Sequence, residues 1–373
     1  MKLKSSIVGS AVKEGVEGVN SENAAINETR KSQMSGTKLK PPHIRLPQVV
    51  ASALLVIGLA AYAQQSADKP IISLSTVSKL DRSQAGIYRT KIGKIDVIAV
   101  SDGTVGLGLT KELIQNAKPG EVERLLARHF QKSPLDASVN AFPIKYENKL
   151  VLIDAGSSEL AGPTAGKLPQ SLRAAGAPPE NITDVFVTHI HPDHTGGLMN
   201  GNTKVFLNAT IHINKREVNY WFNKSIAATA VEPQKTFFAQ VDPKVKPYMD
   251  SGQLKTFEGA TEFFPGFRSE PAYGHTAGLT VYILEDGGEK VMFWGDVVNI
   301  ALQVDDPDIS LRFDSDVAAA AATRRRLLQD AARKGYVVAP DHLPFPGLGG
   351  HIRKDGQAYT WVPVDYVNDA VEK

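Results

Sequence analysis

The stretch Thr188-His189-Ile190-His191-Pro192-Asp193-His194 places three histidines and an aspartate within six residues, directly after the mostly apolar run Ile182–Val187. Such a run is typical of a buried strand, so these polar side chains follow its C-terminal end. Side chains alternate along an extended chain, which puts His189 and His191 on the same side, spaced to bind one metal ion. The proline then turns the chain, so the aspartate and the third histidine can face a second ion. Because imidazole and carboxylate are ligands of zinc and its first-row neighbours, the stretch predicts a metal site.

Three further side chains of the same chemistry lie next to short apolar runs, at His275, Asp296 and His342. The runs are predicted strands at Leu279–Leu284, Val291–Trp294 and Tyr336–Ala339. Each side chain alone is a weak signal, because a lone histidine or aspartate at a strand end is more often a turn or cap residue. Strand ends that converge at one sheet edge are where α/β folds build their sites. We therefore expect these three side chains to join the first cluster.

The order His-x-His-x-Asp-His, followed by His, Asp and His, resembles that of the metallo-β-lactamase superfamily. The resemblance extends from about Gly86 to about Asn368. Within the superfamily the chain is most similar to the methyl parathion hydrolase and lactonase-type group. The segments that carry this closer similarity are Val100–Val105, His189–Leu198, Gln303–Pro307, His342-Leu343 and Phe345–Gly347.

The resemblance implies an α/β fold, a four-layer αββα metallo-β-lactamase sandwich, with two divalent metal ions. Zn²⁺ is the expected metal, with Co²⁺, Mn²⁺ or Fe²⁺ as alternatives. The implied ligands are His189, His191 and His275 for the first ion, Asp193, His194 and His342 for the second, and Asp296 as a bridge. Asp154, at the end of the predicted strand Leu150–Ile153, matches another superfamily position and is expected to orient a ligand imidazole. Its alternative role is that of a turn residue.

Two ions about 3.5–4 Å apart predict hydrolytic chemistry. A water between them loses a proton near neutral pH, and the resulting bridging hydroxide attacks a carbonyl carbon or a phosphorus atom. Asp193 is the candidate for moving the proton to the leaving group, and Asp296 for holding both ions. The chain contains no cysteine, which excludes disulfides and thiolate metal ligands.

Residues 1–63 are predicted to form a leader rather than part of the globular domain. Val49–Ala63 is an almost unbroken apolar stretch that follows basic residues and ends in an A-x-A cleavage signature. It is shorter than the roughly 20 residues that span a bilayer. We therefore predict a signal peptide cleaved near Ala63 and a periplasmic or secreted mature protein. The long polar lead before Met34 suggests that translation starts at that methionine.

The mature chain is predicted to comprise a loosely held arm at 64–85 and one hydrolase domain at 86–373. The leader carries 8 basic and 4 acidic side chains, so the mature chain keeps 34 basic against 36 acidic, and its net charge is −2. This balance gives no indication of a nucleic-acid partner, and no membrane association is expected after cleavage. The expected partner is a small-molecule substrate, and the resemblance suggests a homodimer.

Sequence periodicity predicts several further elements. Ile87–Lys91 and Ile95–Val100 are expected to pair as a hairpin, and Val317–Lys334 to form a long helix. Lys215–Asn223 and Gln234–Met249 are predicted helices of an insertion that lies over the metal site as a lid.

Aromatic residues in the insertion suggest where a substrate is held. In the resembling group, aromatic side chains at the corresponding positions line the substrate mouth. The predicted substrate pocket consists of Trp221, Phe237, Phe238, Asn299 and Phe345. The alternative is that the aromatic residues only seat the helices on the sandwich.

Departures from the organophosphate-hydrolysing pattern bear on the substrate. That pattern has an aromatic residue in the loop where this chain has Glu159–Gly162. It also has a basic residue where this chain has Glu112, and an aliphatic residue near the position of Asn299. We therefore predict that lactones or aryl esters are cleaved, with organophosphate triesters as a side activity. The alternatives are a β-lactamase, a thioesterase of the glyoxalase II kind, an iron-dependent oxidoreductase and a non-catalytic metal-binding protein. Asp296 argues against a β-lactamase, which typically carries Cys or Ser at that position.

Overall fold

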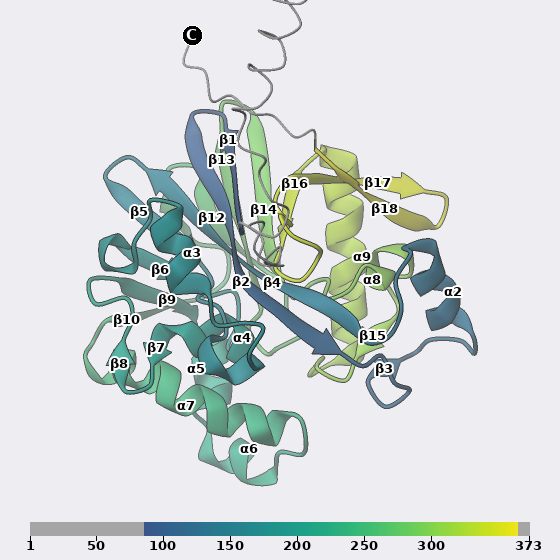
Figure 1. Ribbon diagram of the computed structural model, residues 1–373, viewed down its shortest axis with the longest axis horizontal. Coiled ribbons are helices and arrows are strands. Elements are labelled where there is room, and N and C mark those ends of the chain that lie inside the picture. Colours follow the sequence, from purple (N-terminus) through teal and green to yellow (C-terminus); the bar gives the residue numbers. More distant parts are fainter. Residues whose placement is uncertain (1–85, 365–373) are drawn as a thin grey trace, which may run out of the picture. The chain divides into compact units, whose positions relative to one another are not determined.

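The computed structural model describes residues 86–364, which belong to the unit Arg82–Lys373. Within it, two seven-stranded sheets stack face to face with helices on their outer faces, which is the expected αββα layering (Figure 1). The predicted leader at 1–63 and the arm at 64–85 lie outside the described residues. In the described part, no helix combines the length and apolar character needed to cross a membrane.

The first sheet has its strands in the order β1-β2-β4-β5-β6-β9-β10. Their bounds are Ile87–Ile92, Ile95–Leu107, Leu135–Tyr146, Lys149–Ile153, Asp184–Phe186, Thr210–Asn214 and Leu254–Phe257. The predicted hairpin is confirmed as β1 and β2, which pair antiparallel. β5, β6, β9 and β10 run parallel, so their carboxyl ends meet at one edge. The predicted metal-binding stretch 188–194, called the metal stretch below, follows β6 and therefore begins at that edge.

The second sheet has the order β11-β12-β13-β14-β16-β17-β18. Its strands are Glu262–Phe264, Phe267–Pro271, Thr280–Asp286, Glu289–Gly295, Val337–Pro340, Gly350–Asp355 and Ala358–Pro363. β14 and β16 are parallel neighbours, so Asp296 and His342 leave the sheet at the same edge. The three strands predicted in this region are confirmed as β13, β14 and β16, with bounds that differ by a few residues.

Three apolar layers hold these sheets and helices together. The layer between the sheets contains large aromatic side chains from both, among them Phe142, Phe186, Phe267, Tyr282 and Phe293. The outer face of the first sheet packs against α3 (Leu168–Ala174) and α7 (Gln234–Asp250), and that of the second against α9 (Val317–Lys334). Strands such as β5 and β6 are covered on both faces, which explains why the sequence there is continuously apolar rather than alternating.

The insertion between β9 and β10 consists of three helices, α5 (Lys215–Trp221), α6 (Lys224–Thr229) and α7. Asn214 and Asn223 cap the first two by accepting hydrogen bonds from backbone N–H groups of the following turn. The short helix α6 was not predicted, because six residues are too few to show a helical period. The predicted long helix α9 is confirmed, with Asp316 as N-cap and Gly335 in the left-handed conformation at its end.

The remaining elements are short. They are the α-helices α2 (Glu121–Arg128), α4 (Pro192–Thr195) and α8 (Leu302–Asp305), the 3-10 helices η2 (Ser158–Ala161), η3 (Pro179–Asn181) and η4 (Gly196–Leu198), and the strands β3 (Ile114–Gln115), β7 (Met199–Asn200), β8 (Thr203–Lys204) and β15 (Ser310–Leu311). Asp102, in the segment 100–105 that carries the family resemblance, is buried and accepts backbone hydrogen bonds from Ser157 at 2.9 Å and Leu168 at 2.8 Å. This carboxylate fixes the loop between β5 and α3 beside the metal stretch.

Candidate metal centre

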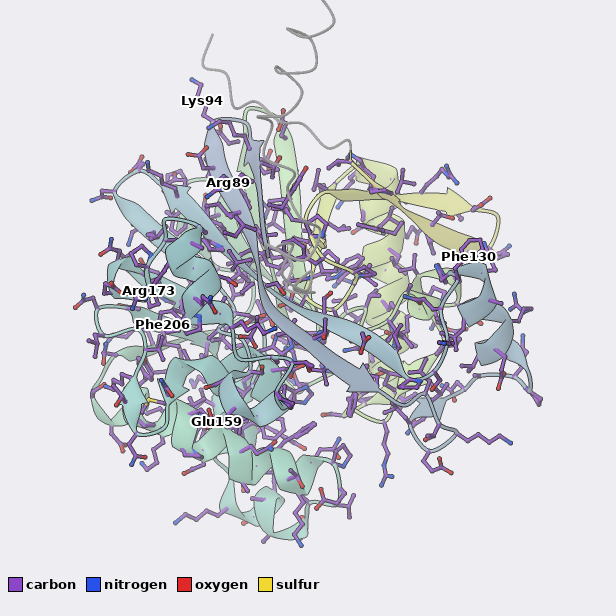
Figure 2. The ribbon with its side chains drawn as sticks, viewed as in Figure 1. Arg89, Lys94, Phe130, Glu159, Arg173 and Phe206 are labelled. Atoms are coloured by element: carbon purple, nitrogen blue, oxygen red, sulfur yellow. The ribbon has the colours of Figure 1, made fainter. Side chains whose placement is uncertain are left out.

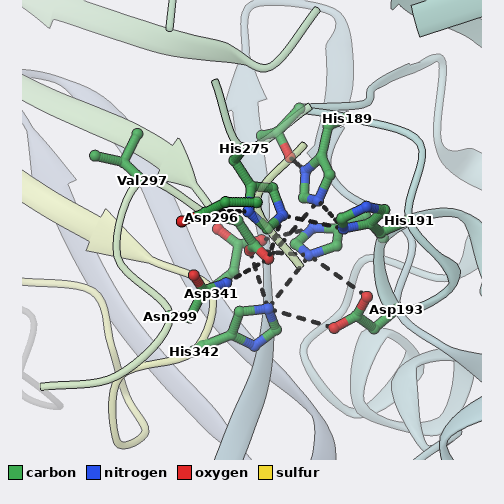
Figure 3. Close-up of polar contacts among 12 residues, drawn as sticks. His189, His191, Asp193, His275, Asp296, Val297, Asn299, Asp341 and His342 are labelled. Carbon is green, nitrogen blue, oxygen red and sulfur yellow. Dashed lines mark hydrogen bonds and ion pairs between the residues drawn. The ribbon is translucent and has the colours of Figure 1, made fainter. Parts of the chain in front are cut away.

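The backbone of the metal stretch directs its side chains in two directions. His191 is extended, with φ −112° and ψ 162°, and caps the single-turn helix α4 that begins at Pro192. His189 and His191 therefore precede the turn, whereas Asp193 and His194 lie on it. Figure 3 shows His189, His191 and Asp193 in one cluster with His275, Asp296 and His342. The last three residues follow β12, β14 and β16 in the chain.

The first group of candidate ligands brings His189, His191 and His275 together, as the sequence predicted. The Nδ1 atom of His191 lies 3.0 Å from Nε2 of His189 and 3.0 Å from Nε2 of His275 (Figure 3). All three rings are buried. Their converging nitrogens, together with an oxygen of Asp296, are arranged so that they could hold one metal ion.

The second group brings together Asp193, His194 and His342. The Nε2 atom of His342 lies 3.3 Å from Nε2 of His194 and 3.3 Å from Oδ2 of Asp193. Asp193 is the most solvent-accessible of the three, with 29% of its side chain exposed. This group could also hold a metal ion.

Asp296 lies between the two groups and presents a different oxygen to each. Its Oδ2 atom is 3.1 Å from Nε2 of His275, and its Oδ1 atom is 3.1 Å from Nε2 of His194 and 3.0 Å from that of His342. Gly295 places it there through a left-handed turn with φ +55°, and a Cβ atom at this glycine would lie 2.8 Å from Oγ1 of Thr188. The carboxylate is thus positioned to contact two ions at once.

Hydrogen bonding alone cannot satisfy this cluster, and a cation can. A neutral imidazole has one N–H donor and one acceptor nitrogen. Nδ1 of His191 lies 3.0 Å from one nitrogen of His189 and one of His275, and it cannot form a hydrogen bond with both unless their protons are arranged to suit it, although all three rings are buried and shielded from water. Neutral imidazoles and carboxylates around a shared point are the donor set that Zn²⁺ and related ions prefer. The residues present therefore fit the metals that the sequence predicted.

The pKa values of the cluster point to the same missing positive charge. Burial and the neighbouring imidazoles hold the pKa values of His189 and His191 well below the ordinary range, so both rings are neutral. Burial also disfavours charged His275 and His342, but the carboxylate of Asp296 outweighs it and raises the pKa of each to about 9. The carboxylate of Asp296 thus favours positive charge on the neighbouring rings, and bound divalent ions would supply this charge in place of the ring protons.

Carboxylates and a carbonyl hold the ligand rings from behind. The Oδ2 atom of Asp154 is 2.9 Å from Nδ1 of His194, as expected for the residue predicted to orient a ligand. The carboxylate of Asp154 also accepts two hydrogen bonds from Thr188, its Oδ1 from the backbone N–H and its Oδ2 from the hydroxyl. Asp314 lies 2.8 Å from Nδ1 of His275, and the Nδ1 atom of His342 is 2.7 Å from the carbonyl oxygen of Ser138. Each contact fixes which ring nitrogen faces the centre.

Three buried carboxylates near the centre were not identified from the sequence. Asp341 adjoins the ligand His342 and lies 3.5 Å from Nδ1 of His194, where burial and the nearby Asp154 hold its pKa well above the ordinary value. Its place beside His342 was a usable signal. Asp314 precedes α9 in a loop, and Glu217 lies in the first turn of α5, where an acidic residue is ordinary. Neither has a motif that marks it.

A cavity of about 230 Å³ opens beside both ligand groups. His191, Asp193, Asp296 and His342 form part of its wall, together with Asn299 and Gln240. Its apolar lining consists of Val105, Leu107, Ala137, Leu160, Ala161, Pro192, Pro233, Phe237 and Phe313. The insertion contributes Phe237 and Gln240 from α7, so it forms a wall of the candidate substrate site, as the predicted lid requires.

Of the five predicted pocket residues, the structure places Phe237 and Asn299 on the cavity wall but not Trp221, Phe238 or Phe345. Trp221 and Phe238 are buried against each other, with ring centroids 4.7 Å apart, and seat the insertion on the first sheet. Phe345 packs against the layer between the sheets. The alternative role of anchoring the fold describes these three aromatic residues, which pack in the core clusters, and Trp221 also contacts the ring of His191, with centroids 5.5 Å apart.

The sequence profile of the Metallo-beta-lactamase superfamily matches residues 135–342, and no curated protein matches the chain. The hydrolase AbOPH of the beta lactamase superfamily is 29% identical, with a TM-score of 0.72 over 77% of this chain and 100% of that one.

A second solved structure is AidC, a dizinc quorum-quenching lactonase in complex with the product N-hexanoyl-L-homoserine. It is 29% identical, with a TM-score of 0.71 over 76% of this chain and 99% of that one. A probable metal-dependent hydrolase from Staphylococcus aureus, 18% identical, shares the fold with a TM-score of 0.61 over 75% of this chain and 100% of that one. The fold, the clustered ligands and the profile match agree: this chain belongs to the metallo-β-lactamase superfamily.

Proposed function

We propose that this protein is a binuclear metal-dependent hydrolase that cleaves uncharged lactones or aryl esters, with organophosphate triesters as a side activity. The observation that carries the proposal is the position of Asp296. Its two oxygens face different ligand groups, and the same carboxylate lies on the wall of a largely apolar cavity. A substrate in that cavity would lie directly against both groups. Within the superfamily, the methyl parathion hydrolase and lactonase-type group is the one that we propose for this chain.

The residues of the chain divide the work of hydrolysis among themselves. Divalent ions, most simply two Zn²⁺, supply Lewis acidity and a source of nucleophilic water at neutral pH when bound. Asp296 holds the two ligand groups in register. Asp193 combines partial exposure with a place on the cavity wall, so its carboxylate can take a proton and pass it to the departing alkoxide. The apolar wall excludes water from the rest of the substrate.

The charge of the cavity wall supports an uncharged substrate. The described residues that line it include no lysine or arginine, and Asp193 and Asp296 are acidic. A carboxylate carried into this cavity would lose hydration without gaining a cationic partner from the chain. Cephalosporins and glutathione thioesters carry such carboxylates. Because the ions and not the chain would have to pair with such a carboxylate, we place a β-lactamase and a glyoxalase II-like thioesterase after a hydrolase of uncharged substrates.

One solved structure at 29% identity, AidC, supports a lactone substrate, and the other, AbOPH, supports hydrolysis. AidC is a dizinc lactonase with an acyl-homoserine product, and AbOPH is a hydrolase of the same superfamily. An acyl chain would pack against Phe237, Leu160 and Phe313 in this chain, which lie on the cavity wall.

For the predicted signal peptide, we propose cleavage near Ala63 and export, which N-terminal sequencing of the mature protein would test.

A substrate panel tests the proposal. The purified protein, loaded with zinc, cobalt or manganese, is assayed with acyl-homoserine lactones, aromatic lactones, aryl esters, a methyl-parathion-like triester and a chromogenic cephalosporin. Turnover of the uncharged lactones or aryl esters, lost in Asp296→Ala and His191→Ala, is the expected result. Preferential cephalosporin hydrolysis, or full activity in both variants, would contradict the proposal.

A further inference from the structure

Glu217, in the first turn of α5, is a fully buried carboxylate outside the candidate ligand groups. No lysine or arginine among the described residues pairs with it. Instead its oxygens accept hydrogen bonds from neutral N–H groups. Burial of a charge is costly unless such bonds compensate for the lost water, so every donor that reaches this side chain matters.

The two oxygens of Glu217 reach two different ligand loops. Oε2 accepts the backbone N–H of Ile190 at 2.7 Å, and Oε1 accepts that of Gly278 at 2.5 Å. Ile190 lies between His189 and His191, and Gly278 lies three residues after His275. A single side chain therefore spans the two loops that carry all three histidines of the first ligand group.

The close approach of these loops leaves no spare room around Glu217. A Cβ atom at Gly278 would lie 2.8 Å from the backbone nitrogen of Glu217, so the loop after His275 packs directly on α5. The indole Nε1 of Trp221, one turn further along α5, donates a third hydrogen bond to Oε2 at 3.0 Å, which joins Glu217 to neither loop. The second ligand group is supported differently, through Asp154 and the carbonyl of Ser138.

We propose that Glu217 is a positioning residue that sets the separation of the His189–His191 and His275 loops, and thereby the affinity of the first ligand group for its ion. The inference rests on the proposed metal centre and makes the insertion helix α5 a part of it. Glu217 binds the backbone between His189 and His191 and the loop after His275, whereas Asp193 and His194 lie further along, on the turn of α4, so its effect falls mainly on the first ion.

Glu217→Gln is the informative substitution. It keeps the size of the side chain but turns one acceptor oxygen into an NH₂ donor, which would face a backbone N–H or the indole N–H. Glu217→Asp keeps the charge but is one methylene shorter, so it cannot reach both loops. Trp221→Phe is the matched control, because it removes the third hydrogen bond of Glu217 and leaves both loop contacts intact.

The measurement is zinc affinity by calorimetry or chelator competition on the full chain stripped of metal. It is made with and without Asp193→Ala, which disables the second group, and thermal unfolding of the metal-free forms is recorded beside it. Glu217→Gln and Glu217→Asp are expected to weaken the first-group affinity by about 10–100-fold, whereas Trp221→Phe changes it by less than about threefold. The affinity of the second group is expected to fall by less than that of the first group.

Two results would overturn the inference. One is wild-type affinity in both Glu217 variants, and the other is an equal loss at both ligand groups that follows the loss of thermal stability. If the wild type binds two ions and the Glu217 variants bind them equally well, the result contradicts the positioning role of Glu217 but not the proposed metal centre. A wild-type chain that binds no ion overturns the proposed function as well.

Discussion

The Oδ1 atom of Asp314 lies 2.8 Å from Nδ1 of His275, and both side chains are buried. Arg324, also buried, lies 3.4 Å from the other oxygen of Asp314. The carboxylate thus directs Nε2 of His275 toward the cluster. Since carboxylates behind metal-ligating histidines contribute about 10–100-fold in affinity, Asp314→Ala is expected to weaken zinc binding by that factor.

Metal competition against a chromogenic chelator measures this effect. Asp330→Ala, on the exposed side of α9, is the control, because Asp330 pairs with Arg333 and Lys334 far from the ligands. Equal zinc affinity in Asp314→Ala and wild type would show that the contact does not orient His275.

An ion pair joins two walls of the cavity. Lys244 of α7 is buried, and its Nζ lies 2.5 Å from Oε1 of Glu159. Glu159, which is labelled in Figure 2, precedes the lining residues Leu160 and Ala161. Burial disfavours the Glu159 charge, but the hydrogen bond from Lys244 outweighs it and lowers the pKa of Glu159 to about 2. We expect Glu159→Gln to loosen this wall and to raise KM for long-chain acyl lactones about two- to fivefold, with kcat unchanged, because a partly exposed pair contributes only about 0.5–1 kcal/mol.

Glu180→Gln is a matched control for that substitution, since Glu180 forms an exposed pair with Arg173 at 2.6 Å and does not line the cavity. Steady-state kinetics over a series of acyl lengths distinguishes the two. Identical KM profiles for Glu159→Gln and Glu180→Gln would show that the Lys244 pair has no influence on the substrate.

The pH dependence of stability is expected to report on Asp184. Its carboxylate accepts hydrogen bonds from Lys149 at 2.8 Å and Thr183 at 2.9 Å, and lies 2.9 Å from Nε2 of His212. Burial raises the pKa of Asp184, but these three contacts together hold it well below the ordinary 3.8. A carboxyl group whose pKa is lowered by folding stabilises the protein above its unfolded-state pKa, and this stabilisation is lost as the pH falls through the folded-state value.

Asp184→Asn is therefore expected to lower the unfolding free energy at pH 7 by about 1.5–3 kcal/mol, the range for hydrogen bonds to charged groups. The difference in unfolding free energy between Asp184→Asn and the wild type should become smaller as the pH falls from about 5 toward 3. Urea unfolding at several pH values measures it, with Asp96→Asn as an exposed control. A difference in unfolding free energy that stays constant with pH would contradict the lowered pKa of Asp184.

Local sequence order was enough to predict the elements whose signals are contiguous. The strands that end at Ile153, Phe186 and Gly295 are apolar runs, and the helix Val317–Lys334 has a clear start and end. The ligand candidates follow these strands, so the sheet edge brings them together. Glu217 and Asp314 could not be identified from the sequence, because their importance arises from contacts with loops distant in the sequence. Trp221 was assigned to the pocket from the family resemblance, and its burial could not be predicted because it depends on how α5 packs.

The central claim is that the chain holds two metal ions with Asp296 between them. The most direct test is the metal content of catalytically active, dialysed protein, determined by elemental analysis together with the rate of lactone hydrolysis. We expect about two zinc ions per chain in the wild type, and loss of at least one ion together with the hydrolytic rate in Asp296→Ala. A fully active wild-type protein with one ion or none, or an Asp296→Ala variant that retains both ions and the full rate, would contradict it.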